Sequence, residues 1–270
     1  MGNRLFPDNV LTVVSNQPIA EGIFRMEVQG TQAGRMNRPG QFVHVRCGSG
    51  IDPLLRRPIS ICDVNEEEQV LTMIYRVEGH GTQVLSQYVP GQQVDVIGPL
   101  GQGFPVDSRR AGEHALLIGG GVGVPPLYYL GKQLRKRGVN VTFVIGFAAA
   151  AQVFLKDELA EVGTVHVTTV DGSMGVKGFV TDVLREDYNL DDRDWDVLYS
   201  CGPLPMLRAL QQKYERSGKE GYISLEQRMG CGIGACLACV CPAQEAGKGK
   251  KYRKICSDGP VFPFGEVKLS

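Results

Sequence analysis

The segment Cys231-Gly232-Ile233-Gly234-Ala235-Cys236-Leu237-Ala238-Cys239 gathers three cysteines in one short loop, and a fourth, Cys256, follows at a distance. A C-x4-C-x2-C spacing with a remote fourth cysteine is the plant-type pattern for a [2Fe–2S] cluster. Three thiolates reach one small cluster only when the backbone wraps tightly around it, with its N–H groups directed at the sulfurs. Gly232 and Gly234 permit the backbone angles of such a loop, because they carry no Cβ. We therefore expect Cys231, Cys236, Cys239 and Cys256 to bind the cluster.

Other uses of these cysteines are less well supported. Disulfides require an oxidising compartment, and the N-terminus does not resemble a secretion signal. A structural zinc site usually shows two C-x2-C-like pairs, whereas here three cysteines precede one remote partner, so zinc is the main alternative. Cys241 breaks the cluster spacing, and we interpret it as a spare thiol beside the cluster.

The composition limits the possible classes of protein. A chain of 270 residues is long enough for two ordinary domains and a small appendage, and its 43% hydrophobic and 21% charged content is typical of soluble globular proteins. Lys+Arg and Asp+Glu number 29 each, so no net field attracts nucleic acid or anionic lipid. The longest apolar run, residues 141–151, is too short to span a bilayer. Eight cysteines, half of them in the cluster pattern, fit a metal site in a reducing cytoplasm, where we expect the protein to reside.

The first third of the chain has the pattern of a small barrel. Short β-rich runs between residues 10 and 98 are separated by Gly and Pro, and such spacing predicts an antiparallel Greek-key barrel. The expected strands are 11–14, 23–28, 41–46, 57–62, 70–77 and 93–97. One helix is expected after Gly81-Thr82, with Thr82 as its N-cap.

Three pieces of this barrel could contact an anionic cofactor. Arg57-Pro58-Ile59-Ser60 offers a guanidinium for phosphate and a hydroxyl for a ring or ribose atom. Gly81-Thr82 offers the amides of a helix N-terminus, and Ile74-Tyr75-Arg76 lies on the strand that leads to them. Each piece alone has an ordinary explanation, since Arg and Ser on a strand usually form a solvated face and Tyr75 is more often a core residue.

The middle third predicts a nucleotide-binding sheet. A strand at 114–118 runs into Gly119-Gly120-Gly121-Val122-Gly123, and a helix is expected at 124–137. This unit lets backbone amides approach a pyrophosphate, although the G-x-G-x-x-G fingerprint is absent. Further strands at 139–145, 164–170 and 196–200 alternate with helices at 152–159, 179–186 and 206–213. Such alternation implies a parallel sheet covered on both faces.

Two further candidates lie at the carboxyl ends of these strands, where such sheets bind ligands. Asp171 could accept a hydrogen bond from a ribose hydroxyl and repel a 2′-phosphate, which favours NAD over NADP. A simple turn role for Asp171-Gly172 is nearly as well supported. Cys201 belongs to Cys201-Gly202-Pro203, and a buried structural cysteine is the alternative there.

Taken in order, these motifs resemble the ferredoxin reductase superfamily. The resemblance implies that Cys201, the one candidate catalytic residue, lies near the nicotinamide. Ile59 stands where many members carry an aromatic residue that stacks on the flavin, so stacking must come from elsewhere or the flavin ring is held by apolar contact only. The implied FAD-binding residues are Arg57, Pro58, Ile59, Ser60, Ile74, Tyr75, Arg76, Gly81 and Thr82, and the implied NAD-binding residues are Gly120, Gly121, Gly123 and Asp171.

Essentially the whole chain resembles the electron-transfer subunits of NAD-linked dihydroorotate dehydrogenases. The most specific stretches are S-L-E-Q-R-M-G-C-G-I-G-A-C at 224–236 and C-S-D-G-P-V-F at 256–262. The resemblance implies an oxidoreductase of pyrimidine biosynthesis that passes electrons from an FMN-containing dihydroorotate dehydrogenase catalytic subunit through [2Fe–2S] and FAD to NAD⁺. A heterotetramer with two copies of each subunit is implied. Flavin subunits of cytoplasmic hydrogenases and of ferredoxin–NAD(P) transhydrogenases share this plan and are the nearest alternatives; a zinc-stapled binding module is an alternative of another class.

We therefore expect a multi-domain fold: an antiparallel FAD-binding β-barrel at 1–108, an α/β parallel-sheet NAD-binding domain at 109–220, and a small [2Fe–2S] domain at 221–270. A cluster that passes electrons outward is not wholly buried, so the loop 231–239 should face the partner, with Ile233 and Leu237 in the interface. All four histidines are interpreted as structural; they are His44, His80, His114 and His166.

Overall fold

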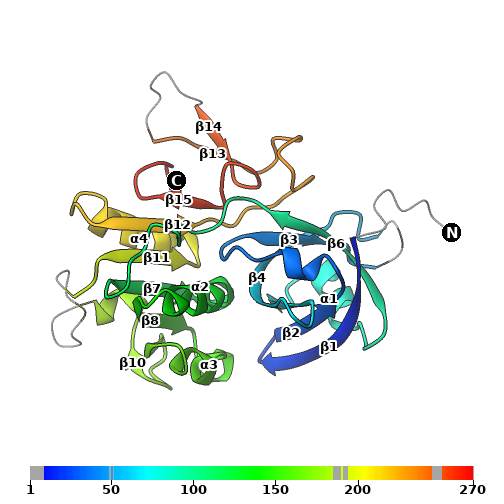
Figure 1. The fold of residues 1–270 in the computed structure, drawn as a ribbon, viewed down its shortest axis with the longest axis horizontal. Coiled ribbons are helices and arrows are strands. Elements are labelled where there is room, and N and C mark those ends of the chain that lie inside the picture. Colours follow the sequence, from blue (N-terminus) through cyan, green and yellow to red (C-terminus); the bar gives the residue numbers. More distant parts are fainter. Residues whose placement is uncertain are drawn as a thin grey trace.

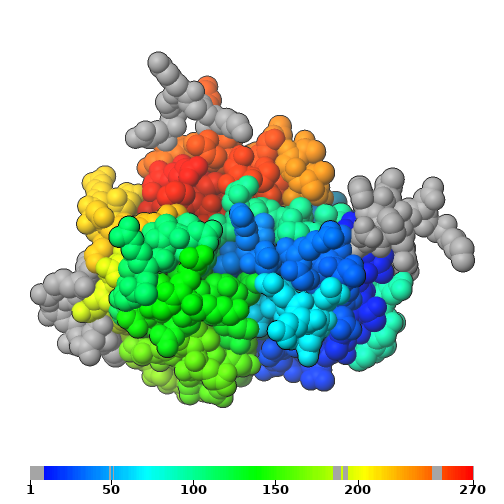
Figure 2. Space-filling view, viewed as in Figure 1, coloured from blue at the N-terminus to red at the C-terminus, as the bar shows by residue number. Residues whose placement is uncertain are grey.

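The computed structural model describes residues 9–48, 50, 52–184, 190, 194–244 and 251–269. A barrel and a mainly parallel sheet lie side by side, and the C-terminal residues extend along one side of both (Figure 1). The space-filling view shows these C-terminal residues, orange to red, packed over the rest of the chain (Figure 2).

The barrel is closed by antiparallel strands in the order β1-β2-β5-β4-β3-β6, which confirms the expected barrel. Within the described chain its strands are β1 (Val10–Ala20), β2 (Ile23–Gln29), β3 (Phe42–Val45), β4 (Arg57–Asn65), β5 (Val70–Arg76) and β6 (Gln93–Leu100). Neighbouring residues of a strand point to opposite faces. On β3, Val43 and Val45 belong to the barrel core, whereas Phe42 packs with the C-terminal residues. The outer face of β3 is therefore covered by the C-terminal part of the chain.

Helix α1 (His80–Ser86) follows β5, but its N-cap is Gly79 and not Thr82. Thr82 occupies the third helical position, and its hydroxyl accepts hydrogen bonds from the backbone N–H groups of Glu78 at 3.0 Å and Gly79 at 3.2 Å. The expected N-cap was wrong because a hydroxyl at this position reaches back over the helix start, as in one half of a capping box.

Among the described residues the second sheet has the order β10-β9-β8-β7-β11-β12-β15. Its strands are β7 (His114–Gly120), β8 (Asn140–Phe147), β9 (Thr164–Thr169), β10 (Val176–Lys177), β11 (Val197–Cys201), β12 (Glu220–Ser224) and β15 (Val261–Pro263). Neighbours pair in parallel except β12 and β15, which are antiparallel. The parallel sheet was expected, but the last two strands in this order, β12 and β15, were not. A short hairpin, β13 (Val240–Pro242) and β14 (Tyr252–Lys254), lies beyond them.

Both faces of the sheet are covered, as expected. Helices α2 (Val124–Lys136) and α3 (Lys156–Ala160) pack on one face, with Leu117 of β7. On the other face, α4 (Leu204–Tyr214) and the 3₁₀ turn η5 (Val180–Val183) pack with Leu116. In the described part of the chain no helix is long and apolar enough to cross a membrane.

Two of the expected helices differ from the structure. The helix expected at 152–159 begins only at Lys156, after the 3₁₀ turn η4 (Ala150–Gln152) and Leu155, whose φ of +59° interrupts the helical path. The helix expected at 179–186 is the single 3₁₀ turn η5, and residues 185–186 lie outside the described residues.

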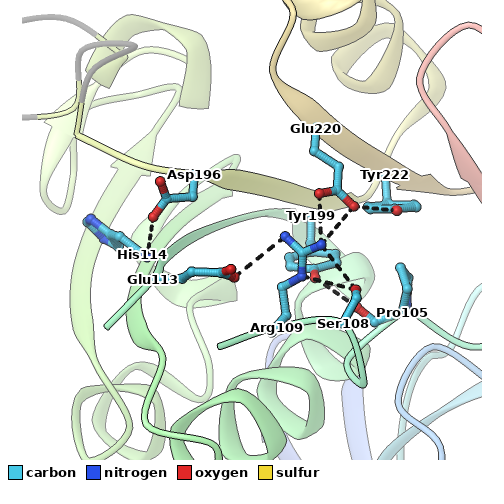
Figure 3. A network of polar contacts seen from close by, with 9 residues as sticks. All are labelled: Pro105, Ser108, Arg109, Glu113, His114, Asp196, Tyr199, Glu220 and Tyr222. Atoms are coloured by element: carbon cyan, nitrogen blue, oxygen red, sulfur yellow. Dashed lines mark hydrogen bonds and ion pairs between the residues drawn. The ribbon is translucent and has the colours of Figure 1, made fainter. Parts of the chain in front are cut away.

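A polar network fixes the connection between barrel and sheet (Figure 3). Arg109 donates hydrogen bonds to both carboxylate oxygens of Glu220, at 2.9 and 2.8 Å, and its side chain is only 9% exposed. The hydroxyl of Tyr199 donates to the carbonyl oxygen of Pro105 at 2.9 Å. Because Glu220 begins β12, this network lies at the amino ends of the parallel strands, opposite the end that carries the nucleotide candidates.

Helix α2 makes a second link between barrel and sheet. Tyr129 of α2 is buried in the barrel core, and Lys132 forms an ion pair of 2.5 Å with Asp63 of β4. From the barrel side, Ile74 of β5 is buried with the core that α2 forms against the sheet. These contacts set the two domains in one orientation, so that the ends of β5 and β7 face each other.

Candidate functional site

The four candidate cluster cysteines lie as two pairs. Cys231 and Cys236 are near the surface and hydrogen-bonded to each other, whereas Cys239 and Cys256 are each 2% exposed. The backbone N–H of Cys256 donates to the Cys239 sulfur at 3.4 Å. Within the described residues, no three metal-ligating side chains converge closely enough for a single metal ion. Two pairs of thiols fit a [2Fe–2S] cluster, in which four cysteines bind two irons.

The Cys231 thiol is prepared to ionise. Burial raises its pKa, but hydrogen bonds from the backbone of Ile233, the thiol and backbone of Cys236 and the backbone of Ala235 outweigh burial and lower the pKa to about 6. The thiolate is the metal-binding form of cysteine. Inside the fold, burial and then the neighbouring Cys239 raise the pKa of Cys256 to about 12. The loop therefore stabilises negative charge on its outer side through directed N–H groups, which is the property expected from the sequence.

The glycines of the loop are required by its geometry. Gly232 and Gly234 have φ of +73° and +85°, in the left-handed region that favours glycine. A Cβ on Gly232 would lie 2.7 Å from Nδ1 of His44, and one on Gly234 would lie 2.8 Å from the Ser257 hydroxyl. The loop is thus held between β3 of the barrel and the segment that carries Cys256.

Cys241 lies beside the buried pair of Cys239 and Cys256. It is on β13, opposite Arg253 of β14, and its thiol is nearly buried. Burial and then the neighbouring Cys239 raise its pKa to about 11, so at neutral pH it remains a thiol. This environment agrees with its interpretation as a spare cysteine.

The structure brings two of the flavin candidates, Arg57 and Gly81, together. A Cβ on Gly81 would lie 2.6 Å from the Arg57 guanidinium, so this side chain lies directly on the first turn of α1. Arg57 also donates to the carbonyl oxygen of Leu55 at 2.6 Å. The fixed guanidinium and the helix N-terminus form one positively polarised corner, suited to a phosphate. Thr82 lies at the same corner, where its hydroxyl is engaged by the helix start.

The remaining flavin candidates divide by strand face. On β4, Pro58 and Ser60 are half-buried, whereas Ile59 is 6% exposed and belongs to the barrel core. On β5, Tyr75 is also in the core, where its hydroxyl donates to Asn16 at 2.9 Å and burial raises its pKa. The structure therefore places Ile59 and Tyr75 as core residues.

Arg76 connects the flavin candidates to the nucleotide candidates. It ends β5, pairs with Glu78 at 2.8 Å, and lies over the Gly-rich turn, where a Cβ on Gly121 would be 3.1 Å from its guanidinium. Gly121 has φ of +53° and begins the 3₁₀ turn η3 (Gly121–Gly123). The Arg76 cation and the backbone of the Gly-rich turn thus meet at the carboxyl end of β7.

The Gly-rich turn packs against the second nucleotide motif. A Cβ on Gly123 would lie 2.2 Å from the carbonyl oxygen of Cys201, and one on Gly202 would lie 2.9 Å from the backbone nitrogen of Gly120. From the sequence we expected the Gly-rich turn and Cys201-Gly202-Pro203 at strand ends, and in the structure their backbones lie in contact. Burial, followed by the charge of Glu226, raises the pKa of Cys201, so this thiol stays protonated at neutral pH.

Asp171 is in an exposed turn after β9. Its Oδ1 atom accepts hydrogen bonds from the backbone N–H of Ser173 at 2.9 Å and from its hydroxyl at 2.6 Å, and these bonds lower the pKa of Asp171. This geometry is an Asx-type turn. Both bonds are accepted by the same carboxylate oxygen of Asp171.

Two residues near the site were not selected from the sequence. Glu226 has an exposed side chain, and desolvation of its carboxyl group raises its pKa although the charge of Arg76 acts to lower it. His44 is fully buried on the outer face of β3, and burial followed by the charge of Arg56 lowers its pKa. Glu226 stands inside the most specific sequence stretch, whereas no sequence signal marks His44.

Comparisons with known proteins agree with this geometry. Residues 226–268 match the iron-sulfur cluster binding domain of dihydroorotate dehydrogenase B, and residues 117–212 match the oxidoreductase NAD-binding domain. These matches confirm the expected iron–sulfur cluster and NAD. A chain from an NADH-dependent reduced ferredoxin–NADP oxidoreductase is similar with a TM-score of 0.83 and 30% identity, covering 100% of this chain and 92% of that one. A cytochrome P450 reductase from Amycolatopsis is similar with a TM-score of 0.64 and 25% identity, covering 77% of this chain and 66% of that one. The flavin reductase fold of these neighbours supports FAD as the third cofactor.

Curated relatives are more similar still. The dihydroorotate dehydrogenase B (NAD⁺) electron transfer subunit of Bacillus cereus (strain ATCC 14579) is 55% identical over 259 residues, which cover 96% of this chain and 98% of the relative. The corresponding protein of Bacillus anthracis (strain CDC 684) is also 55% identical over the same coverage. With its barrel, its parallel sheet and its four paired cysteines, this chain belongs to the family of dihydroorotate dehydrogenase B electron transfer subunits.

Proposed function

We propose that this chain passes electrons from a dihydroorotate-oxidising catalytic subunit, through a [2Fe–2S] cluster and FAD, to NAD⁺ in pyrimidine biosynthesis. The observation that carries the proposal is the placement of three candidate sites in sequence. The cluster loop contacts β3 of the barrel at His44, and the flavin strand β5 ends at the nucleotide turn through Arg76 and Gly121. The proposed route of the electrons therefore runs through neighbouring sites of one chain.

The residues present fit the three cofactors. Cys231, Cys236, Cys239 and Cys256 supply the thiolates, and the corner of Arg57 and α1 supplies charge and amides for the FAD phosphates. Bound flavin exchanges either single electrons or a hydride, which is the chemistry needed between a cluster and a nicotinamide. The chain's own work is to hold the groups in place. Gly120, Gly121 and Gly123 bring backbone amides to the pyrophosphate of NAD, and Cys201 contacts the nicotinamide as a neutral thiol.

We further propose the finer roles expected from the sequence for the other candidates. Pro58, Ser60 and Arg76 line the flavin, with Ile59, Ile74 and Tyr75 supporting them from the barrel and domain cores. Asp171 selects NAD over NADP through its ribose contact. The three functional units are 1–108, 109–220 and 221–270, with β12 and β15 joining the third unit to the second.

The partner is a catalytic dihydroorotate dehydrogenase subunit, and we propose that it contains FMN and assembles as a heterotetramer with two copies of each subunit in the cytoplasm. Two exposed apolar side chains of the cluster loop, Ile233 at 61% and Leu237 at 60%, support docking at this loop. Leu237 also has φ of +58°, a conformation that costs a non-glycine residue free energy and is often found at functional sites.

Co-expression with an FMN-containing dihydroorotate dehydrogenase tests the proposal. The expected result is a stable complex that forms orotate with NAD⁺, while the catalytic subunit alone does not use NAD⁺. Recovery of a hydrogenase subunit instead, or NAD⁺-linked reduction of ferredoxin without orotate formation, would favour the transhydrogenase-like alternative raised by the 30% identical neighbour. A colourless chain that contains zinc would favour the binding-module alternative.

A further inference from the structure

His44 lies between the flavin barrel and the cluster loop. On β3 it pairs with Pro58 of the flavin strand β4, and its side chain points outward, on the same face as Phe42, which packs with Cys239 and Cys256. A Cβ on Gly232 would lie 2.7 Å from the Nδ1 atom of His44. One residue therefore contacts both the cofactor-bearing strand and the loop that carries Cys231.

The side chain of His44 is fully buried, yet in the described part of the chain neither ring nitrogen has a hydrogen-bond partner of good geometry. A buried polar group without a partner costs about 1–3 kcal/mol, so such groups are usually satisfied. The backbones of Cys231, in the cluster loop, and of Arg56, before β4, are both close enough to interact with the ring. From this buried imidazole we infer that its N–H finds an acceptor in the cofactor-loaded protein.

We propose that His44 is a positioning residue of the electron relay: its ring N–H is directed at the cluster loop, seats the Cys231–Gly232 segment on the barrel, and raises the midpoint potential of the cluster. Hydrogen bonds to a cluster and its ligands stabilise the more negative, reduced state and are one lever on iron–sulfur potentials. The proposal rests on the proposed cluster and flavin sites, and it adds the residue that couples them.

The test compares His44→Phe with His44→Asn in the full chain reconstituted with FAD and cluster. Phe keeps an aromatic side chain but has no ring nitrogen, and Asn supplies an amide nitrogen near the position of Nδ1. We expect His44→Phe to lower the cluster's midpoint potential and change its electron paramagnetic resonance spectrum, with FAD content unchanged. An equilibrium shift of about tenfold toward the oxidised cluster corresponds to about 59 mV for one electron. His44→Asn should recover part of both changes.

His166→Phe is the matched control, because His166 is a partly buried histidine of β9 in the other domain, outside the cluster region. It should leave the potential and the spectrum unchanged. If His44→Phe loses its cluster but His44→Asn retains it, the polar contact with the loop is supported. Equal cluster loss in both His44 variants, or an unchanged potential and spectrum in His44→Phe, would overturn the proposal. Absence of iron and sulfide from the wild-type chain would instead overturn the proposed function.

Discussion

Replacing Gly123 with Ala should damage NAD binding while sparing the other two cofactors. The added Cβ would lie 2.2 Å from the Cys201 carbonyl oxygen, 2.4 Å from its carbonyl carbon and 2.6 Å from the Gly202 nitrogen. All three are backbone atoms, so no side-chain rotation relieves the contact. To restore 3.0 Å from the oxygen, the Gly-rich turn and the Cys201-Gly202 segment must separate by about 0.8 Å.

A displacement of about 1 Å at a positioning element costs on the order of 10²-fold in rate. We therefore expect the Gly123→Ala enzyme to lose about 10- to 100-fold in kcat/KM for NADH, which is about 1.4–2.7 kcal/mol of transition-state stabilisation. The assay is anaerobic stopped-flow reduction of the flavin by NADH, with FAD, iron and labile sulfide measured on the same sample.

Gly34→Ala is the control for the loss of a glycine, since its Cβ would meet only ordinary contacts, at 3.6 and 3.9 Å, in the barrel. It should reduce flavin at the wild-type rate. Wild-type kinetics for Gly123→Ala would refute the assignment of the Gly-rich turn, and an equal defect in Gly34→Ala would show that general destabilisation explains the loss.

Three further predictions concern single side chains. Cys236→Ser should abolish cluster assembly and leave FAD bound, whereas Cys241→Ser should retain both, as measured by iron, sulfide and flavin content; joint loss of FAD and cluster would contradict the division into domains. Asp171→Ala should reduce the preference for NADH over NADPH in flavin reduction, and an unchanged ratio removes this residue from the specificity argument. Because burial lowers the pKa of His166 below the ordinary 6.5, the folded state binds a proton there less readily than the unfolded chain, so stability falls as pH drops below about 6.5. In chemical denaturation between pH 7 and 5, His166→Phe should show a weaker fall than the wild type; a parallel fall would contradict this.

The barrel and the parallel sheet could be predicted because their signals are local. Alternation of apolar residues marks a strand, and a strand followed by a Gly-rich turn and a helix marks the nucleotide unit. The edge strand β15 could not be predicted, because Val261–Pro263 is short and its pairing with β12 depends on contacts between distant parts of the chain. Helix α3 was expected too early because periodicity does not reveal the positive φ of Leu155.

The candidate site likewise combines features with a local sequence signal and features that depend on contacts between distant parts of the chain. Cysteine spacing located the cluster loop, since the spacing itself carries the chemistry. The contact of Gly123 with Cys201 and that of His44 with Gly232 arise only when separate elements pack together. A single histidine on a short strand has no sequence signal for such a role, because only the register of β3 decides whether it faces the barrel core or the cluster.

The most direct test of the relay is anaerobic reduction of the complex by dihydroorotate in the absence of NAD⁺, followed by visible absorption and electron paramagnetic resonance. We expect the flavin absorbance to bleach and the signal of a reduced [2Fe–2S] cluster to appear. Addition of NAD⁺ should restore the flavin absorbance and remove the cluster signal. NADH formation at the wild-type rate in a Cys236→Ser complex that contains no cluster would contradict the account.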